Sequence, residues 1–480
     1  MLFRLVYDED LAQAAYLIGC QRSGEAIVID PERDIDRYLD LARSHGLRIV
    51  AVAETHIHAD FLSGARELAT HLDAMVYVSG AGGAEWRSRW LDGIRHRELV
   101  DGDRFTVGGI EFTARHTPGH TPEHLSYLIT DRGGDATEPM GIVSGDFVFV
   151  GDLGRPDLLE SAAGVAGAME PAARELAESA RRFLELDDHL QVWPAHGSGS
   201  ACGKALGAVP QTTVGYERRF NEALGLAADD AAFVDFILQG QPEPPGYFAR
   251  MKRQNRDGVP LLGSLPAPRR LTPQEIPRAI DGARIVDVRP WPAFRDGHLP
   301  GSNWAMGGVG FLMVVGSYVK PDERILIVCD EDRVESLVRA LVRIGLDHVD
   351  AFVTPEDLEV WQASDGEMSS VPELEAEAFV ERMIESDHHV LDVRRSVEHR
   401  VAALDGSINV AHTRLVDRIE ELPSKGCLLV HCAGGVRSAA AVAELRRRGF
   451  DSTNVAGGWK AIVRTNVDGG LVTEGGRGGG

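Results

Sequence analysis

Three short segments carry histidine and aspartate residues that could bind a metal ion. They are residues 55–61 (Thr-His-Ile-His-Ala-Asp-Phe), 117–120 (Thr-Pro-Gly-His) and 144–146 (Ser-Gly-Asp). Each segment follows an apolar, strand-like run, so we expect it on a loop at the end of a strand, where side chains converge. Two imidazoles and one carboxylate that leave positions open are typical of a non-haem iron(II) centre that handles oxygen. The pattern predicts an enzyme.

The hydrophobic pattern indicates the elements that must position these groups. Residues 49–53, 110–114 and 140–143 are the strand-like runs that precede the three segments, and residues 162–186 have a helical pattern. Strands alternate with turns and helices over roughly the first 240 residues. This alternation predicts a layered α/β domain.

Composition limits the class of protein. A chain of 480 residues is longer than one hydrophobic core usually serves, so we expect about two to four domains. The net charge of −23, without a compensating basic patch, argues against binding to nucleic acid or to an acidic membrane. No apolar run approaches the length of a membrane span, and residues 1–19 lack the apolar core of a signal peptide. Five cysteines without a Cys-x-x-Cys pair argue against a disulfide framework, so we expect a cytoplasmic enzyme with free thiols.

The second half of the chain contains an internal repeat. Residues 285–289 (Ile-Val-Asp-Val-Arg) are echoed by residues 390–394 (Val-Leu-Asp-Val-Arg), and each is followed by a second apolar run and a helical pattern. Each copy predicts a β-α-β-α module with a parallel sheet. The predicted boundaries are residues 1–240 for the first domain, 241–267 for a linker, 268–366 and 372–470 for the two modules, and 471–480 for a flexible tail.

The ordered His-x-His-x-Asp, Gly-His and Gly-Asp motifs resemble those of the metallo-β-lactamase superfamily, whose fold is an αββα sandwich. The resemblance covers approximately residues 1 to 235. Phe61 stands where the binuclear zinc hydrolases of this superfamily carry a ligand for their second metal, which favours a site for one metal ion. Within the superfamily, the motifs look most similar to those of the persulfide dioxygenases.

That resemblance implies a ligand set and a reaction. The reaction is oxidation of a low-molecular-weight thiol persulfide by O2 to sulfite and free thiol, with one Fe(2+) per chain. Relatives commonly self-associate, so the resemblance also implies a homo-oligomer. The implied iron ligands are His56, His120 and Asp146. The residues expected to line the pocket or to orient the ligands or the persulfide are His58, Asp60 and His196.

Cys202 lies six positions after His196 in a run of small residues. Free cysteines are commonly buried and inert. A thiol so near a candidate site could instead carry sulfur or face the substrate, depending on its pKa and exposure. The sequence leaves both interpretations open, and Cys202 is kept as a candidate catalytic residue.

Residues 430–438 (Val-His-Cys-Ala-Gly-Gly-Val-Arg-Ser) follow a strand-like run and open a helix. Backbone N–H groups and the positive end of the helix would favour the thiolate of Cys432, and Arg437 adds a fixed positive charge. The segment resembles the Cys-x-x-x-x-Arg active-site loop of the rhodaneses. The resemblance implies that residues 372–470 form an active sulfurtransferase domain with Cys432 and Arg437 as catalytic residues.

The middle module differs in its loop. When Val328 is aligned with Val430 without gaps, Asp330 takes the cysteine position and Glu335 the arginine position. Cys329 then matches His431, ahead of the loop. The carboxylates would repel a persulfide anion, so we predict that residues 268–366 form an inactive rhodanese-like module that serves structure or docking.

These predictions combine into one hypothesis. The iron domain makes sulfite, and a persulfide on Cys432 passes its outer sulfur to that sulfite to give thiosulfate; the reverse order, in which thiosulfate supplies the persulfide, stays open. One alternative is a zinc-dependent thioester hydrolase of the glyoxalase II type with a fused sulfurtransferase. Another is a non-catalytic sulfur carrier or sensor.

Overall fold

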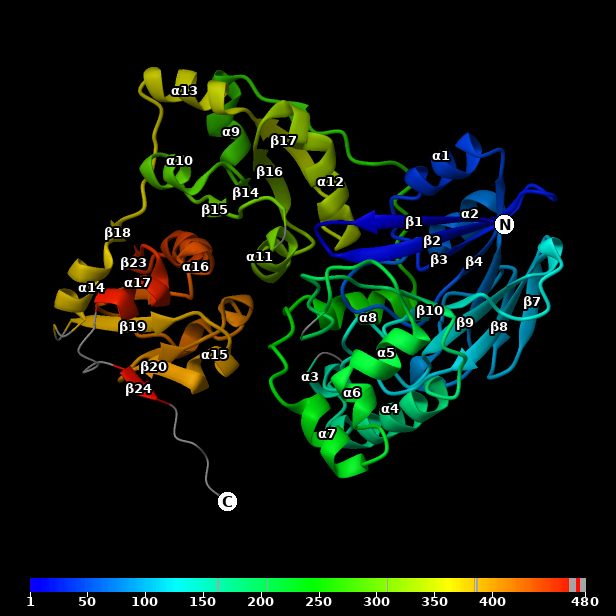
Figure 1. Ribbon diagram of the computed structural model, residues 1–480. Coiled ribbons are helices and arrows are strands. Elements are labelled where there is room, and N and C mark those ends of the chain that lie inside the picture. The colour runs from blue at the N-terminus through cyan, green and yellow to red at the C-terminus, as the bar shows by residue number, and fades with distance from the viewer. Residues whose placement is uncertain are drawn as a thin grey trace. The chain divides into compact units, whose positions relative to one another are not determined.

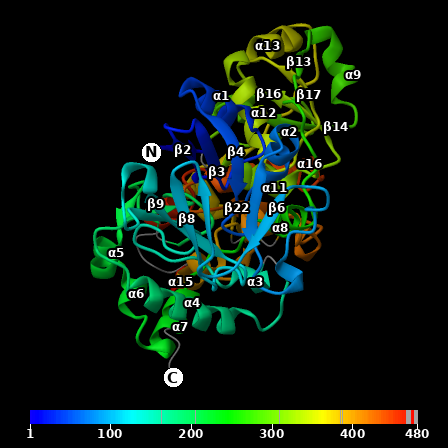
Figure 2. The same cartoon turned by 90° about the vertical axis from the view of Figure 1, so that its right-hand side faces the viewer.

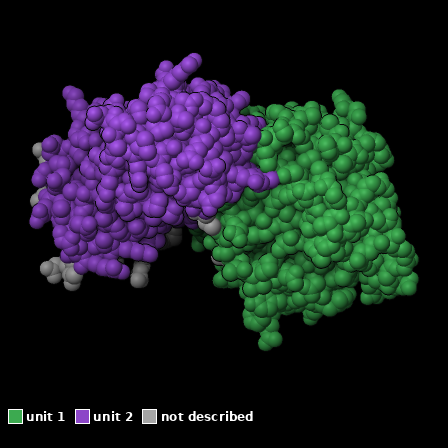
Figure 3. Space-filling model, turned by 90° about the horizontal axis from the view of Figure 1, so that it is seen from above, with its two compact units in different colours: residues 1–265, 342–345 green, residues 266–341, 346–480 purple. Residues whose placement is uncertain are grey.

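The computed structural model describes residues 1–161, 164–204, 206–308, 310–383, 385, 387–465 and 472–474. The chain divides into two compact units, which are coloured separately in Figure 3. Unit 1 comprises residues 1–265 together with 342–345, and unit 2 comprises residues 266–341 and 346–480. Each unit has its own sheets and its own buried clusters.

Two six-stranded sheets form the centre of unit 1 (Figures 1 and 2). The first has the order β1-β2-β3-β4-β5-β6 and the second β12-β11-β10-β9-β8-β7. Tyr16 and Ile27 from the first sheet share one buried cluster with Phe112 and Tyr127 from the second, so the sheets pack face to face. The strands of the first sheet are β1 (Leu2–Asp8), β2 (Gln13–Cys20), β3 (Glu25–Ile29), β4 (Arg48–Ala53), β5 (Met75–Ser79) and β6 (His96–Leu99). Those of the second are β7 (Arg104–Val107), β8 (Ile110–His116), β9 (Leu125–Asp131), β10 (Gly141–Gly145), β11 (Gln191–Pro194) and β12 (Thr212–Thr213).

Helices cover the outer face of each sheet. Tyr38 and Leu68, from α1 and α2, pack against the first sheet. Leu176 of α4 packs against the second sheet in a cluster that also holds Phe233 of α7. The predicted αββα sandwich is therefore confirmed. The helices are α1 (Asp36–Ser44), α2 (Ala65–Leu72), α3 (Leu158–Ser161), α4 (Met169–Phe183), α5 (Val214–Phe220), α6 (Glu222–Gly225) and α7 (Asp230–Leu238).

The stretch 241–267, predicted to be a linker, contains helix α8 (Phe248–Asp257). Met251 and Asn255 on this helix are buried, and the Asn255 amide donates hydrogen bonds to the carbonyls of His58 and Phe61. The proline- and glycine-rich ends of the stretch suggested a linker, yet the residues between them pack against the loop that carries the metal-binding motif. The prediction of a linker is wrong for this helix.

Unit 2 contains two five-stranded parallel sheets, with the orders β13-β17-β16-β14-β15 and β18-β23-β22-β19-β21. The matching strand order confirms the internal repeat. The first sheet comprises β13 (Arg269–Arg270), β14 (Ala283–Asp287), β15 (Asn303–Trp304), β16 (Arg324–Val328) and β17 (Val349–Val353). The second comprises β18 (Glu373–Leu374), β19 (His388–Asp392), β21 (Ile408–Asn409), β22 (Cys427–His431) and β23 (Ser452–Val455), and β20 (Ala402–Leu404) pairs with β24 (Val472–Glu474).

The two modules share a buried cluster, in which Trp304 and Tyr318 of the first lie with Leu391 and Val430 of the second. Over the part of the chain that is described, no helix is long and apolar enough to cross a membrane. The helices of the first module are α9 (Ile276–Ile280), α10 (Trp291–Asp296), α11 (Phe311–Tyr318), α12 (Val334–Arg343) and α13 (Pro355–Ala363). Those of the second are α14 (Ala376–Arg382), α15 (Ser396–Val401), α16 (Val436–Arg447) and α17 (Gly458–Thr465).

Candidate functional site

His56, His120 and Asp146 come together in unit 1. Each lies on a loop just beyond the end of a strand, β4, β8 or β10, and one ligand atom from each lies within 4.8 Å of the others. The Asp146 Oδ2 atom is 3.5 Å from Nε2 of His120 and 3.8 Å from Nε2 of His56. All three side chains are buried. The strand ends thus place two imidazoles and one carboxylate around one point.

The electrostatics of this cluster suit a cation. Burial lowers the pKa of His56 and of His120 well below the usual value, so both rings are neutral and have a lone pair to offer. Burial raises the pKa of Asp146 to about 6. Neither carboxylate oxygen of Asp146 has a hydrogen-bond partner among the described residues. Buried polar atoms without a partner are costly, and a bound metal ion would satisfy them.

A second buried group adjoins the first and contains Asp60, His196 and Cys202. The His196 Nε2 atom lies 3.3 Å from Oδ2 of Asp60 and 3.4 Å from Oδ1 of Asp146. Cys202 is 1 % exposed, and burial, together with the charges of Asp60 and Asp146, raises the pKa of its thiol well above the usual value. Asp60, His196 and Cys202 therefore lie beside the metal-ligand cluster, as predicted. The raised pKa keeps the Cys202 thiol protonated when no cation is bound.

His58 faces a third group, which the sequence analysis missed. Its Nε2 atom lies 3.2 Å from Asp30 and 3.1 Å from Glu54, and all three side chains are buried. Burial alone would lower the pKa of His58, but the two carboxylates raise it well above the usual value. Asp30 and Glu54 directly follow the neighbouring parallel strands β3 and β4. Their position at the carboxyl ends of paired strands was the signal that could have found them.

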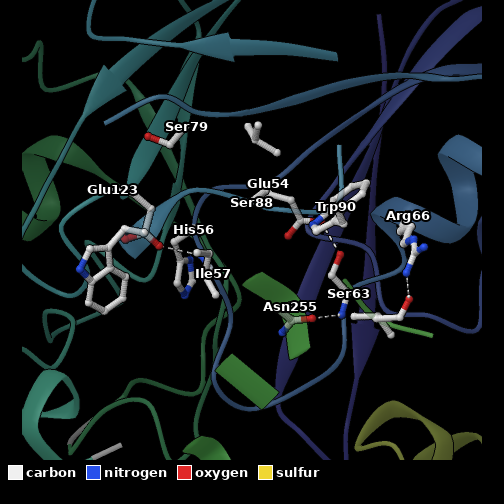
Figure 4. A pocket seen from close by; sticks show the side chains of 13 residues that line it. Glu54, His56, Ile57, Ser63, Arg66, Ser79, Ser88, Trp90, Glu123 and Asn255 are labelled. Carbon is white, nitrogen blue, oxygen red and sulfur yellow. Dashed lines mark hydrogen bonds between the residues drawn. The ribbon is translucent and has the colours of Figure 1, made fainter. Parts of the chain in front are cut away.

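A pocket reaches this region, and Glu54, His56 and Glu123 belong to its lining (Figure 4). The Glu123 Oε1 atom accepts a hydrogen bond of 2.9 Å from the backbone N–H of Ile57. The hydroxyl of Ser63 donates to Glu54 at 2.5 Å, and the side chain of Asn255 accepts from the backbone N–H of Ser63. These bonds fix the backbone that presents His56.

The loop after β22 in unit 2 surrounds the thiol of Cys432. The backbone N–H of Gly435 donates to its Sγ atom at 3.1 Å, and the hydroxyl of Ser438 donates at 3.5 Å. Gly435 has a φ of 96°, in the left-handed region that favours glycine. The donors and the start of α16 therefore direct partial positive charge toward this sulfur.

Arg437 lines a pocket of about 350 Å³ beside this loop. Its guanidinium forms two hydrogen bonds with Glu398, of 2.7 and 2.8 Å. Arg395 and His412 also line the pocket, as do Trp304 and Met313 from the first module of unit 2.

The strand register corrects the predicted alignment of the middle module. Asp287 pairs with Val328, whereas the equivalent Asp392 pairs with His431. The residue that follows each partner is Cys329 or Cys432, so Cys329, and not Asp330, occupies the cysteine position. An extra loop residue before α12 concealed this match.

The surroundings of the two cysteines differ. Burial, together with carboxylates that include Asp330 and Asp287, raises the pKa of the Cys329 thiol to about 12. Its loop consists of Asp330 and the short 3-10 helix Glu331–Arg333, where the other loop has two glycines. A protonated thiol among carboxylates is a poor sulfur carrier.

Comparisons with known proteins agree with this architecture. The profile of the Metallo-beta-lactamase superfamily matches residues 8–196, and that of the Rhodanese-like domain matches residues 272–364 and 375–465. A crystal structure of a metallo-beta-lactamase from Staphylococcus aureus subsp. aureus COL is 38% identical. The match covers 74% of this chain and 99% of that one, with a TM-score of 0.66. This chain belongs to the metallo-beta-lactamase superfamily. Its superfamily domain is followed by two rhodanese-like domains.

Two further relatives match the superfamily domain of this chain. The mitochondrial persulfide dioxygenase of Homo sapiens is 25% identical over 232 residues, which covers 48% of this chain and 78% of that protein. A hydroxyacylglutathione hydrolase of Synechocystis sp. is 28% identical over 182 residues, which covers 38% of this chain and 63% of that protein.

Proposed function

We propose that this protein is a non-haem iron persulfide dioxygenase coupled to a rhodanese sulfurtransferase. It oxidises a low-molecular-weight thiol persulfide to sulfite and produces thiosulfate. The observation that carries the proposal is the buried cluster of His56, His120 and Asp146, whose carboxylate oxygens have no hydrogen-bond partner among the described residues. The same chain carries a rhodanese loop with both Cys432 and Arg437.

The residues of the cluster fit one metal ion. His56, His120 and Asp146 would hold it, because two neutral imidazoles and a carboxylate are donors that iron(II) accepts. His58 is engaged with two carboxylates, and Phe61 has no donor atom, so neither adds a ligand. When bound, iron(II) supplies the redox chemistry that brings oxygen onto a sulfur atom.

The side chains around the cluster have separate roles. Asp60 and His196 contact each other beside the metal ligands, and we assign them to the wall of the site. Cys202 lies against the same two residues and is proposed as the thiol that faces the persulfide sulfur. The buried setting excludes water from the reacting sulfur, which protects a persulfide from side reactions.

Cys432 completes the reaction sequence. A second molecule of the thiol persulfide passes its outer sulfur to the Cys432 thiolate and leaves as the free thiol. The persulfide on Cys432 then transfers this sulfur to sulfite: a new S–S bond forms in thiosulfate, the S–S bond to Cys432 breaks, and its electron pair stays on the Cys432 thiolate. The N–H of Gly435 and the hydroxyl of Ser438 stabilise that leaving thiolate. The name of the human relative, a persulfide dioxygenase, supports the oxidation step.

Oxygen uptake and product analysis test the proposal. Purified protein is incubated with glutathione persulfide in an oxygen electrode, and sulfite and thiosulfate are then measured by mass spectrometry. We expect oxygen uptake with thiosulfate from the wild type, and oxygen uptake with free sulfite from Cys432→Ser. Equal sulfite from both proteins would contradict the coupling, and the absence of oxygen uptake would contradict the dioxygenase.

A second candidate function is zinc-dependent hydrolysis of a thioester. The group of Asp60, His196 and Cys202 favours it, because these residues could hold a second metal next to the first. The name of the Synechocystis relative also agrees with this chemistry. Turnover of S-lactoylglutathione by zinc-loaded protein, without oxygen uptake, would favour this function over the first.

A further inference from the structure

A stripe of basic residues lies along one face of helix α8. Lys252 and Arg253 follow Ala249 by three and four residues, and Arg256 follows Arg253 by three and Lys252 by four. At this spacing the side chains share a face of the helix. Together with Ala249, they line a cavity of about 330 Å³. Basic residues around one cavity are notable in a chain whose net charge is −23.

Lys252 is unusual among these cations. It is 7 % exposed, and no described residue forms a hydrogen bond or ion pair with its ammonium group. The Nζ atom lies 4.2 Å from the centre of the Trp86 ring, a cation–π contact. Burial lowers the pKa of Lys252 to about 8, and the negative charge of Glu123 opposes this effect. A buried ammonium without a hydrogen-bonding partner is costly unless it serves an anion.

The other charged side chains that line the cavity do not cancel the positive charge of Lys252, which favours an anionic ligand. Arg253 is exposed and has no ion pair among the described residues. Arg256 contacts Asp257 at 2.7 Å and Glu85 at 3.6 Å, so its charge is partly balanced. Glu85 is the carboxylate in the lining, and its side chain is 77 % exposed and screened by water.

The cavity borders the metal-ligand cluster. Ile57, between His56 and His58 in the sequence, lines this cavity and also the pocket of Figure 4 that reaches His56. Trp86 lines both as well. A molecule whose sulfur reaches His56 and His120 would therefore place the remainder of its structure against Trp86 and Lys252.

We propose that Lys252, with Arg253 and Arg256, forms an anion-binding site for the carrier part of the persulfide substrate. The ligand is a thiol that bears carboxylate or phosphate groups, whose charge Lys252 receives while Trp86 packs against the carrier. The proposal rests on the proposed function for the identity of the sulfur group, but binding of the free thiol does not require the oxidation. Lys252 is a specificity-determining residue here, not a group that takes part in the chemistry.

Two substitutions of Lys252 test the site in the full-length protein. Lys252→Met keeps an unbranched side chain of similar length and removes the charge, whereas Lys252→Arg keeps a charge. Arg219→Met, which removes an exposed cation on α5, is the matched control. Binding of glutathione and of coenzyme A is measured by calorimetry, without oxygen or persulfide, and 2-mercaptoethanol serves as the uncharged thiol.

We expect the Lys252→Met change to weaken binding of at least one anionic thiol by roughly tenfold to hundredfold, as expected for a lost charge-assisted hydrogen bond. Lys252→Arg should retain most of the binding, and the control should match the wild type. Loss for glutathione alone identifies carboxylate recognition, and loss for coenzyme A alone identifies phosphate recognition. Wild-type affinity in Lys252→Met, or no binding of either thiol to the wild type, would overturn the proposal.

Kinetics separate this proposal from the proposed function. With the persulfides of the same thiols, Lys252→Met should raise KM by the same factor and leave kcat, and the rate with 2-mercaptoethanol persulfide, near the wild-type values. An equal loss with the uncharged persulfide would overturn the selectivity. If no persulfide supports oxygen uptake while the thiols still bind through Lys252, the proposed function fails and the anion site stands.

Discussion

Cys329 and Cys432 occupy the same place in the two rhodanese-like modules of unit 2, each directly after the strand residue that pairs with the Asp of an Asp-x-Arg sequence. In both modules this Arg forms an ion pair with the Asp at 2.6 Å, so the same contact stabilises the end of the strand. The two thiols nevertheless have opposite surroundings, because backbone and hydroxyl donors reach Cys432 and carboxylates lie near Cys329. The middle module therefore has a cysteine at the equivalent position, but among the described residues no donor reaches its sulfur as Gly435 and Ser438 reach that of Cys432.

This difference predicts which thiol carries sulfur. After incubation with thiosulfate, we expect an added sulfur on Cys432 and none on Cys329, because carboxylates and burial keep the Cys329 thiol protonated. Peptide mass spectrometry under non-reducing conditions measures both sites in one sample. Sulfur on Cys329 in a Cys432→Ser protein would show that the middle module is active.

Arg437 should be necessary for sulfur transfer from an anion. Arg437→Gln removes the positive charge and leaves the carboxylate of Glu398 facing the pocket, so we expect kcat/KM with thiosulfate and cyanide to fall by roughly tenfold to hundredfold. The double variant Glu398→Gln/Arg437→Gln should recover part of that loss, since the repelling carboxylate is gone. Unchanged activity in the single variant would contradict a role for Arg437.

His58 should stabilise unit 1 without binding the metal. His58→Leu leaves Asp30 and Glu54 buried and facing each other, so we expect the free energy of unfolding to fall by about 3 kcal/mol. Thermal unfolding measures the loss, and His45→Leu, at an exposed position, is the control. Folded His58→Leu protein should retain its iron. Loss of iron at unchanged stability would instead make His58 a ligand.

Binding of an anionic thiol should depend on pH through Lys252. The pKa of Lys252 in the free protein is about 8, below the ordinary lysine value, so the ammonium loses its proton as the pH rises through and above 8. We expect the affinity for S-methylglutathione, which has no titrating thiol, to fall between about pH 7 and pH 9. Comparison with Lys252→Arg corrects for titration of the ligand. The same decline in both proteins would exclude Lys252 as the titrating group.

Much of the candidate site could be predicted because its residues follow apolar runs. Residues 49–53 and 110–114 lie within β4 and β8, so the positions of His56 and His120 follow from pattern alone. The partners of His58 could not be predicted in this way, because Asp30 is 28 positions away in the sequence and only the pairing of β3 with β4 brings it close.

Two other features were hidden for different reasons. Helix α8 is short and flanked by proline and glycine, and its contacts with segments far away in the sequence, among them the metal-binding loop, hold it in place. The match of Cys329 with Cys432 was hidden by one extra residue in the loop. Matching the helices aligns Val334 with Val436, whereas matching the strands aligns Val328 with His431. An alignment without gaps satisfies only the first match.

The central claim is that His56, His120 and Asp146 hold a single iron ion that supports oxidation of a persulfide. Metal content of anaerobically purified protein, measured together with oxygen uptake on glutathione persulfide, tests it most directly. We predict about one iron per chain, with both iron and oxygen uptake lost in His120→Ala and retained in His45→Ala. About two zinc ions per chain without oxygen uptake would contradict the account and favour the thioester hydrolase.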